Sequence, residues 1–184
     1  MRERTSLAIT VKAPGACDAE ELKAFERFVR KGGEVQSHGL ATLVRQANAL
    51  AFVHSSRQVV GVGALKQPLA GYRKSVFEKS AAVRAAAEFP VELGWIYVAP
   101  AERGKGHSGR LVEALLKRAP DAGIFATSRT DNTPMHRSLE RFGFVRAGKP
   151  YTSTRGRYKL QLFVRSAAQA RAGGAAPRTA RPSA

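Results

Sequence analysis

A short loop rich in glycine and basic residues could bind a phosphate group. It runs from Arg103 to Gly109 and reads Arg-Gly-Lys-Gly-His-Ser-Gly. Glycine at positions 104 and 106 would let a ligand approach the backbone closely, because no Cβ stands in the way. From His107 onward apolar residues recur at helical spacing, so the free N–H groups of a helix start would face the same spot. The loop is therefore a candidate anion site.

Three other interpretations of this loop compete. Residues 104–109 satisfy the G-x-G-x-x-G pattern of dinucleotide-binding folds, but in those folds the strand runs straight into the first glycine, whereas Pro100 to Arg103 intervene here. A P-loop needs Ser or Thr after its Gly-Lys pair, where this chain has Gly106. A glycine turn without a ligand stays open, although Arg103 and Lys105 at a helix start disfavour it.

The elements that must position this loop can be predicted on both sides of it. Val91 to Val98 is rich in β-branched and aromatic residues and predicts a strand. Glu92 is an acidic residue within this otherwise apolar strand. After the loop, Leu111, Val112, Leu115 and Leu116 form the apolar face of an amphipathic helix.

The remaining pattern predicts alternating strands and helices. We expect strands over 6–11, 49–54, 58–66, 123–128, 144–147 and 158–164, with a hairpin between the second and third and a polar loop over 148–157. We expect helices from a capping box at Asp18 to Gly32, over 35–47 with an interruption at Gly39, over 80–88, and over 135–142 with Thr133 as N-cap. The segment 67–90 around Tyr72 is an insertion that could carry selectivity, although a packing role is favoured for each of its residues.

Length and composition indicate one domain over residues 1–165. Residues 166–184 are rich in Ala, Gly, Pro and Arg and are expected to form a disordered basic tail. The single cysteine, Cys17, excludes an intramolecular disulfide and leaves no cysteine cluster for zinc. The N-terminus lacks the apolar segment of a secretory signal, and no apolar run reaches transmembrane length. A cytoplasmic location without membrane association is the expectation.

The charge of the chain is unusually positive. Lysine and arginine number 31 against 14 acidic residues, which gives a formal net charge of +17. Such a balance favours anionic partners, including nucleic acid and phosphorylated cofactors. An arginine-rich composition spread over a solvated surface would produce the same number. Both interpretations remain open from composition alone.

Two motifs together resemble a known family. Arg103 to Ser108 is similar to the Arg/Gln-x-x-Gly-x-Gly/Ala signature of the GNAT superfamily of N-acetyltransferases, with Ser108 where the signature prefers a smaller residue. The family's second hallmark, an asparagine followed by a helix and a Gly-Phe pair, resembles Asn132 to Phe144, which reads NTPMHRSLERFGF. The resemblance covers roughly Ala49 to Val164. It implies an α+β fold in which a mixed, mostly antiparallel sheet of six to seven strands has helices on both faces and splays between 93–98 and 124–127.

The resemblance also implies acetyl-CoA as co-substrate and no metal. Its pyrophosphate would be received by backbone N–H groups of the loop, and the pantetheine arm would meet main-chain groups of the preceding strand. His107 stands at a variable position of the signature, where a packing or surface role is favoured. The cofactor-binding residues implied are Tyr97, Val98, Arg103, Gly104, Lys105, Gly106, His107, Ser108, Gly109 and Asn132.

Acetyl transfer needs a neutral amine and a proton for the leaving thiolate. Glu92 lies eleven residues before Arg103, the spacing at which several family members place a glutamate base, and it is the candidate base. A strand-edge glutamate paired with an arginine is the alternative. The family commonly has a tyrosine acid where this chain has Leu139. His136, Ser138 or a water could substitute, and His136 could equally be an exposed helix residue.

The predicted function is therefore N-acetylation of a primary amine by direct transfer from acetyl-CoA in a ternary complex. The basic composition points to an acceptor with anionic character, such as an aminoacyl-tRNA, a nucleic-acid-associated protein or an acidic metabolite. Two alternatives from other classes remain: a catalytically weak module that binds acetyl-CoA, and a basic nucleic-acid-binding protein. Monomers and homodimers are both usual for the fold.

Overall fold

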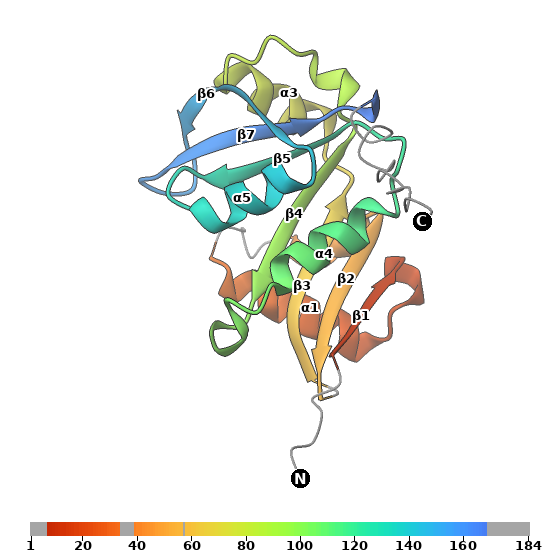
Figure 1. Ribbon diagram of the computed structural model, residues 1–184. Coiled ribbons are helices and arrows are strands. Elements are labelled where there is room, and N and C mark those ends of the chain that lie inside the picture. The colour runs from red at the N-terminus through yellow and green to blue at the C-terminus, as the bar shows by residue number, and fades with distance from the viewer. Residues whose placement is uncertain (1–6, 34–38, 57, 169–184) are drawn as a thin grey trace, which may run out of the picture.

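A seven-stranded sheet forms the centre of the protein, with strand order β1-β2-β3-β4-β5-β7-β6 (Figure 1). The computed structural model describes residues 7–33, 39–56 and 58–168. Every strand pair is antiparallel except β4 with β5. The predicted α+β fold is confirmed. The strands are β1 (Leu7–Lys12), β2 (Ala49–Ser55), β3 (Gln58–Lys66), β4 (Val91–Val98), β5 (Ile124–Arg129), β6 (Val145–Thr152) and β7 (Lys159–Arg165).

Helices cover both faces of this sheet. On one face, α4 (His107–Leu116) and α5 (Thr133–Arg141) pack against the strands through one large apolar cluster. On the other, α1 (Ala19–Lys31) and α2 (Leu40–Arg45) cover β2 and β3, while α3 (Ala70–Lys79) covers β5, β6 and β7. Figure 1 shows α4 and α5 in front of the sheet and α1 and α3 behind it. Both faces are thereby buried, as a sheet with two apolar faces requires.

The sheet opens between β4 and β5. These parallel strands pair only at Val91 with Ile124 and at Glu92 with Phe125, after which no pairing continues. On the other side of β4, Val62 pairs with Tyr97 and Ala64 with Gly94, so β4 carries an extra residue at this point. Trp95 adopts φ 54° there, as expected for a bulge, which bends a strand and increases its twist. The predicted splay of the two strands is confirmed.

The segment before β4 differs from its prediction. The helix predicted over 80–88 is wrong, because the structure places α3 earlier and ends it before Ala81, which has φ 50°. Residues 86–88 form a short 3₁₀ turn. Burial decides the position: the Phe77 ring stacks on Phe89 at 5.5 Å and meets Phe125 edge-on at 5.7 Å. Packing of these rings outweighs the helix preference of the alanine-rich stretch.

Other predicted boundaries were close, with two corrections. Asn132, and not Thr133, is the N-cap of α5, because its side chain accepts a hydrogen bond from the Met135 N–H at 3.3 Å. The loop predicted over 148–157 is shorter, since β6 continues to Thr152. Within the helix predicted over 35–47, only α2 is described, and residues 34–38 lie outside the described part. The capping box of Asp18 and Glu21 is confirmed.

The predicted tail covers residues 166–184, of which residues 169–184 lie outside the described part of the chain. Within the described part of the chain, no helix combines the length and apolar character needed to cross a membrane.

One close backbone contact fixes the start of β5 beside the end of the α3–β4 connection. A Cβ built on Gly123 would lie 1.9 Å from the Glu88 carbonyl oxygen. We therefore expect Gly123→Ala to lower the free energy of unfolding in urea by about 2–3 kcal/mol, as overpacking does. Gly15, where a Cβ meets nothing within 4 Å, is the matched control, and Gly15→Ala should change it by less than about 0.5 kcal/mol. Equal effects of the two substitutions would contradict the assignment of this contact.

Candidate active site

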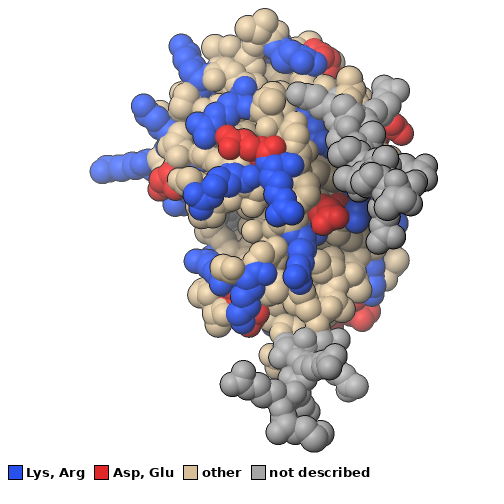
Figure 2. Space-filling model, viewed as in Figure 1, with Lys and Arg blue, Asp and Glu red and all other residues tan. Residues whose placement is uncertain are grey.

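A cleft of about 920 Å³ opens where β4 and β5 separate. Its walls come from both strands, from the loop before α4, from α5, and from Tyr72 of α3. Because α3 and α4 lie on opposite faces of the sheet, the cleft reaches both faces. Figure 2 shows basic side chains gathered around the hollow between α4 and α5.

The glycine loop forms one end of this cleft. Gly104 and Gly106 have φ 79° and 78°, a left-handed conformation that other residues rarely adopt. A Cβ on either glycine would meet nothing within 4 Å, so backbone conformation and not crowding calls for glycine. Gly106 is the N-cap of α4 and offers no capping side chain. The first N–H groups of α4 therefore have neither an intrahelical acceptor nor a capping side chain, which suits an anion.

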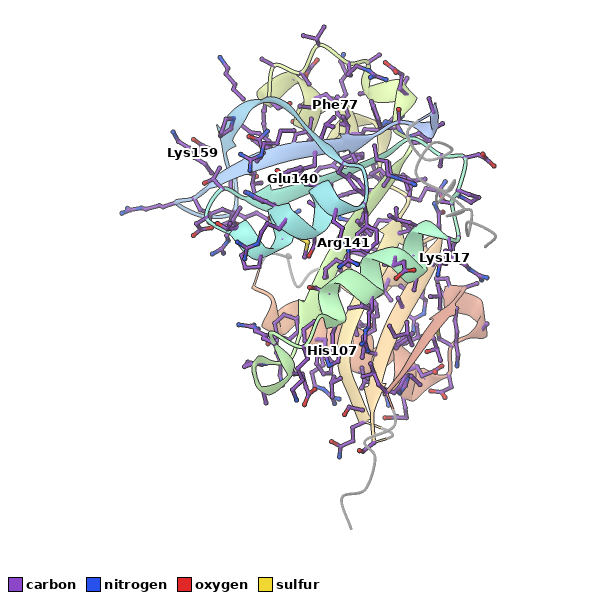
Figure 3. All side chains as sticks on the ribbon, in the orientation of Figure 1. Phe77, His107, Lys117, Glu140, Arg141 and Lys159 are labelled. Atoms are coloured by element: carbon purple, nitrogen blue, oxygen red, sulfur yellow. The ribbon has the colours of Figure 1, made fainter. Side chains whose placement is uncertain are left out.

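The side chains of the loop hold its shape. Arg103 donates from Nε to the Val98 carbonyl at 3.1 Å, and its guanidinium lies 5.6 Å from the centre of the Tyr97 ring. Glu102 accepts from Lys105 at 2.8 Å and lies 3.2 Å from His107 Nε2. The hydrogen bond from Lys105, and then that from His107, lowers the pKa of Glu102. Figure 3 shows His107 at the loop end of α4. Lys105 and His107 are thus engaged with Glu102.

Most of the predicted cofactor residues come together in the cleft. Those that line it are Tyr97, Val98, Arg103, Gly104, Gly106, His107, Ser108 and Asn132, whereas Lys105 and Gly109 are not among its described lining residues. Asn132 also caps α5.

Positive charge dominates the walls of the cleft. Two acidic residues, Glu92 and Glu102, are among its described lining residues. Figure 3 shows Arg141 on the side of α5 that faces α4. The basic lining residues are Lys31, Lys66, Arg103, Arg129, Arg137, Arg141 and Arg155. Such a lining attracts anionic ligands.

Glu92 lies at the point where the strands part, and only 4% of it is exposed. Lys66, its cross-strand partner on β3, places Nζ 2.7 Å from Oε1. Tyr72 donates its hydroxyl to the same oxygen at 3.3 Å. Lys66 Nζ also lies 5.1 Å from the centre of the Trp95 ring. A buried carboxylate is thus held by an ammonium and a phenol, and the arginine partner considered for Glu92 is in fact a lysine.

Lys66 can reach Glu92 because Gly94 has no side chain. A Cβ at Gly94 would lie 2.8 Å from Lys66 Cε and 3.1 Å from its Nζ. The lysine therefore crosses the face of β4 at the position that a side chain would occupy.

The candidates for the thiolate acid are placed differently. His136 is 4% exposed and is not among the described lining residues of the cleft. Its Nε2 lies 2.8 Å from the Arg129 carbonyl oxygen and its ring packs on Phe163. Leu139 and Ser138 both line the cleft. The structure therefore places Ser138, but not His136, among the described residues that line the cleft.

The comparisons with known proteins agree with this geometry. A model of the acetyltransferase (GNAT) family matches residues 22–144. The chain belongs to the GNAT family. Acyl-CoA is the acyl donor typical of GNAT acyltransferases. No curated protein sequence is significantly similar to the chain.

Solved GNAT structures share the fold at low sequence identity. An acyl-CoA N-acyltransferase from Pseudomonas aeruginosa has a TM-score of 0.62 at 17% identity, covering 88% of this chain and all of its own. FeeM, an N-acyl amino acid synthase from uncultured soil microbes, has a TM-score of 0.69 at 13% identity, covering 92% and 95%. YncA from Salmonella typhimurium, solved with its cofactor acetyl-CoA, has a TM-score of 0.62 at 15% identity, covering 98% and 99%. These similarities concern the fold.

Three residues that line the cleft of this GNAT protein, Lys66, Tyr72 and Arg155, were missed as site residues by sequence reasoning. Lys66 is the last residue of an apolar run. Its position beside Glu92 follows from the register of β3 with β4, which the sequence does not reveal. Tyr72 lies in the predicted insertion over 67–90. The sequence signal for a role in the site was an aromatic residue next to basic residues. Arg155 lies in the polar loop between β6 and β7, far along the chain from Lys66, Tyr72 and Glu92.

Proposed function

We propose that this GNAT protein is an N-acetyltransferase that moves the acetyl group of acetyl-CoA to a primary amine. The observation that carries this proposal is one cleft lined both by the glycine loop before α4 and by a buried carboxylate, Glu92.

The residues present fit acetyl-CoA. Its pyrophosphate suits the left-handed glycine loop, where the N–H groups at the start of α4 are without intrahelical acceptors. Arg137 and Arg141, one turn apart on α5, line the same cleft and could neutralise phosphate charge. Acetyl-CoA, when bound, supplies the acetyl group as a thioester. The description of YncA with its cofactor acetyl-CoA supports this choice of donor.

Glu92 is proposed to take the proton that the acceptor amine must lose. Lys66 and Tyr72 both contact Oε1, so we assign the proton to Oε2. The neutral amine nitrogen then forms a bond to the acetyl carbon, the carbon–sulfur bond breaks, CoA leaves as a thiolate, and the second proton that the nitrogen loses is available to protonate it. Ser138 is the side-chain candidate in the cleft to protonate this thiolate, and a water is the alternative.

Direct transfer is proposed, because both substrates can occupy the cleft together from opposite faces of the sheet. A covalent route through a cysteine thiolate would need a cysteine in the cleft, and the single cysteine of the chain, Cys17, is not among the described lining residues. Its pKa is raised by burial, which disfavours the reactive thiolate.

The test is release of CoA thiol from acetyl-CoA in the presence of a panel of primary amines. Amine-dependent release, with an acetylated amine found by mass spectrometry, is the expected result. Tight acetyl-CoA binding without release from any amine would instead favour a binding module. Absence of both binding and release would overturn the proposal.

A further inference from the structure

A second, smaller cavity of about 190 Å³ lies beside the cleft, between α3 and the C-terminal strands. The two cavities share Tyr72, Thr127 and Arg155 as wall residues. The hydroxyl of Tyr72 contacts Glu92, so the small cavity begins next to the proposed base. We call it the side pocket.

The lining of the side pocket suits an anion. Lys79 and Arg155 supply positive charge, and none of the described residues that line the pocket is acidic. Hydroxyl groups are dense, since six hydroxyl side chains line it in addition to Thr127: Tyr72, Ser75, Tyr151, Ser153, Thr154 and Tyr158. Arg155 is held in the wall by its backbone N–H, which donates to Ser153 Oγ at 3.0 Å.

Tyr151 and Tyr72, two of the three tyrosines that line the side pocket, stay neutral. Burial, followed by the charge of Glu92, raises the pKa of Tyr151 to about 12. The same two causes raise the pKa of Tyr72 well above its usual range. Tyr72 as a whole is 39% exposed, but its hydroxyl is directed at buried Glu92. At neutral pH neither hydroxyl carries negative charge. The Tyr72 O–H is donated to Glu92, whereas the Tyr151 hydroxyl can donate to an anion in the side pocket.

Size limits what the side pocket can hold. Pockets for whole drug-sized ligands span roughly 300–1,000 Å³, so a cavity of about 190 Å³ suits one small group. A molecule that placed its amine at Glu92 could extend this group past Tyr72 into the side pocket.

We propose that the side pocket binds an anionic group of the acetyl acceptor, so that the acceptor is a small amine that also carries a carboxylate or phosphonate. This inference rests on the proposed function. Lys79 and Arg155 would attract the anionic group, while Glu92 attracts the ammonium. An acceptor with a second positive charge, such as a polyamine, would place that charge against Lys79 and Arg155.

The test compares amines that differ only in the charge of the distal group. The probes are linear ω-amino carboxylates from glycine to 6-aminohexanoate, their primary amides, and 2-aminoethylphosphonate. Equilibrium dialysis against the full chain should show at least about tenfold tighter binding of the best acid than of its amide, as hydrogen bonds to a charged group provide. The Arg155→Gln, Lys79→Gln double variant should abolish this difference. In thiol-release assays the same preference should appear in KM.

Arg146→Gln is the matched control. Arg146 lies on exposed β6, pairs with Glu140 at 3.2 Å, and is not among the described lining residues of either cavity. Its substitution should leave the preference for the acid intact. Binding of the acid that is displaced by CoA would place it in the glycine loop and overturn the inference, as would equal affinity for acid and amide. Loss of the preference in Arg146→Gln would do the same.

The two proposals fail in different ways. If neutral amines are acetylated and acids are not preferred, the side-pocket inference is wrong and the acetyltransferase proposal stands. If the acid binds selectively but no amine releases CoA thiol, the pocket is an anion site and the acetyltransferase proposal is wrong.

Discussion

Replacing Glu92 by glutamine should lower kcat/KM for acetyl transfer at pH 7 by about 10²–10³-fold, within the range that general bases contribute. The amide keeps the shape of the side chain but cannot accept the proton of the acceptor's ammonium. The deficit should shrink as the pH rises toward 10, because a growing fraction of an alkyl amine with pKa near 10 is then already neutral. Initial rates of thiol release between pH 7 and pH 10 measure both effects.

Loss of the ion pair could lower stability as well as activity. Glu92→Gln leaves the Lys66 ammonium in a mostly buried position without its carboxylate, which is costly. The Glu92→Gln, Lys66→Met double variant removes this charge and should show the same pH-dependent deficit. Glu113→Gln is the control of identical chemistry, since exposed Glu113 pairs with Lys117 on α4. A deficit below twofold at pH 7, or one that is constant up to pH 10, would rule out Glu92 as the base.

The parts of this site that could be predicted from the sequence are those specified locally. The loop from Arg103 to Gly109 combines a strand, glycines that require left-handed backbone and a helix start within one short stretch. Each of these features depends on near neighbours in the chain. Glu92 could be chosen as a candidate site residue by the same reasoning, because an acidic residue in an otherwise apolar strand can be recognised from the sequence of that strand alone.

The acceptor end could not be predicted, because it is assembled from distant segments. Lys66, Tyr72 and Arg155 come from β3, α3 and the β6–β7 loop, and no short pattern joins them. The position of α3 depends on rings, Phe77 and Phe89, that meet across the insertion, whereas the local alanine content favoured a helix that starts ten residues later, at position 80. Nucleic-acid association and the oligomeric state stay predictions.

A substitution in the glycine loop tests the acetyl-CoA end of the cleft, as Glu92→Gln tests the acceptor end. Gly106→Glu should weaken acetyl-CoA binding by about a hundredfold or more, because loss of two hydrogen bonds to a charged phosphate costs at least this much. The new carboxylate would itself occupy the N–H groups at the start of α4, and it would repel the pyrophosphate. Calorimetric titration of acetyl-CoA into the protein measures the change in Kd.

Gly106→Gln separates charge from shape at this position. Glutamine has the size of glutamate and meets the same left-handed φ of 78°, which costs either residue about 1–2 kcal/mol. Since a Cβ at Gly106 meets nothing within 4 Å, both variants should fold with equal midpoints in urea. The part of the affinity loss that is due to charge is then the difference between the two variants, and it should shrink as salt screens the phosphates. Equal Kd values for the two variants at low salt would mean that the loop does not bind a phosphate through its positive helix end, and the pyrophosphate would have to be assigned to the arginines of α5.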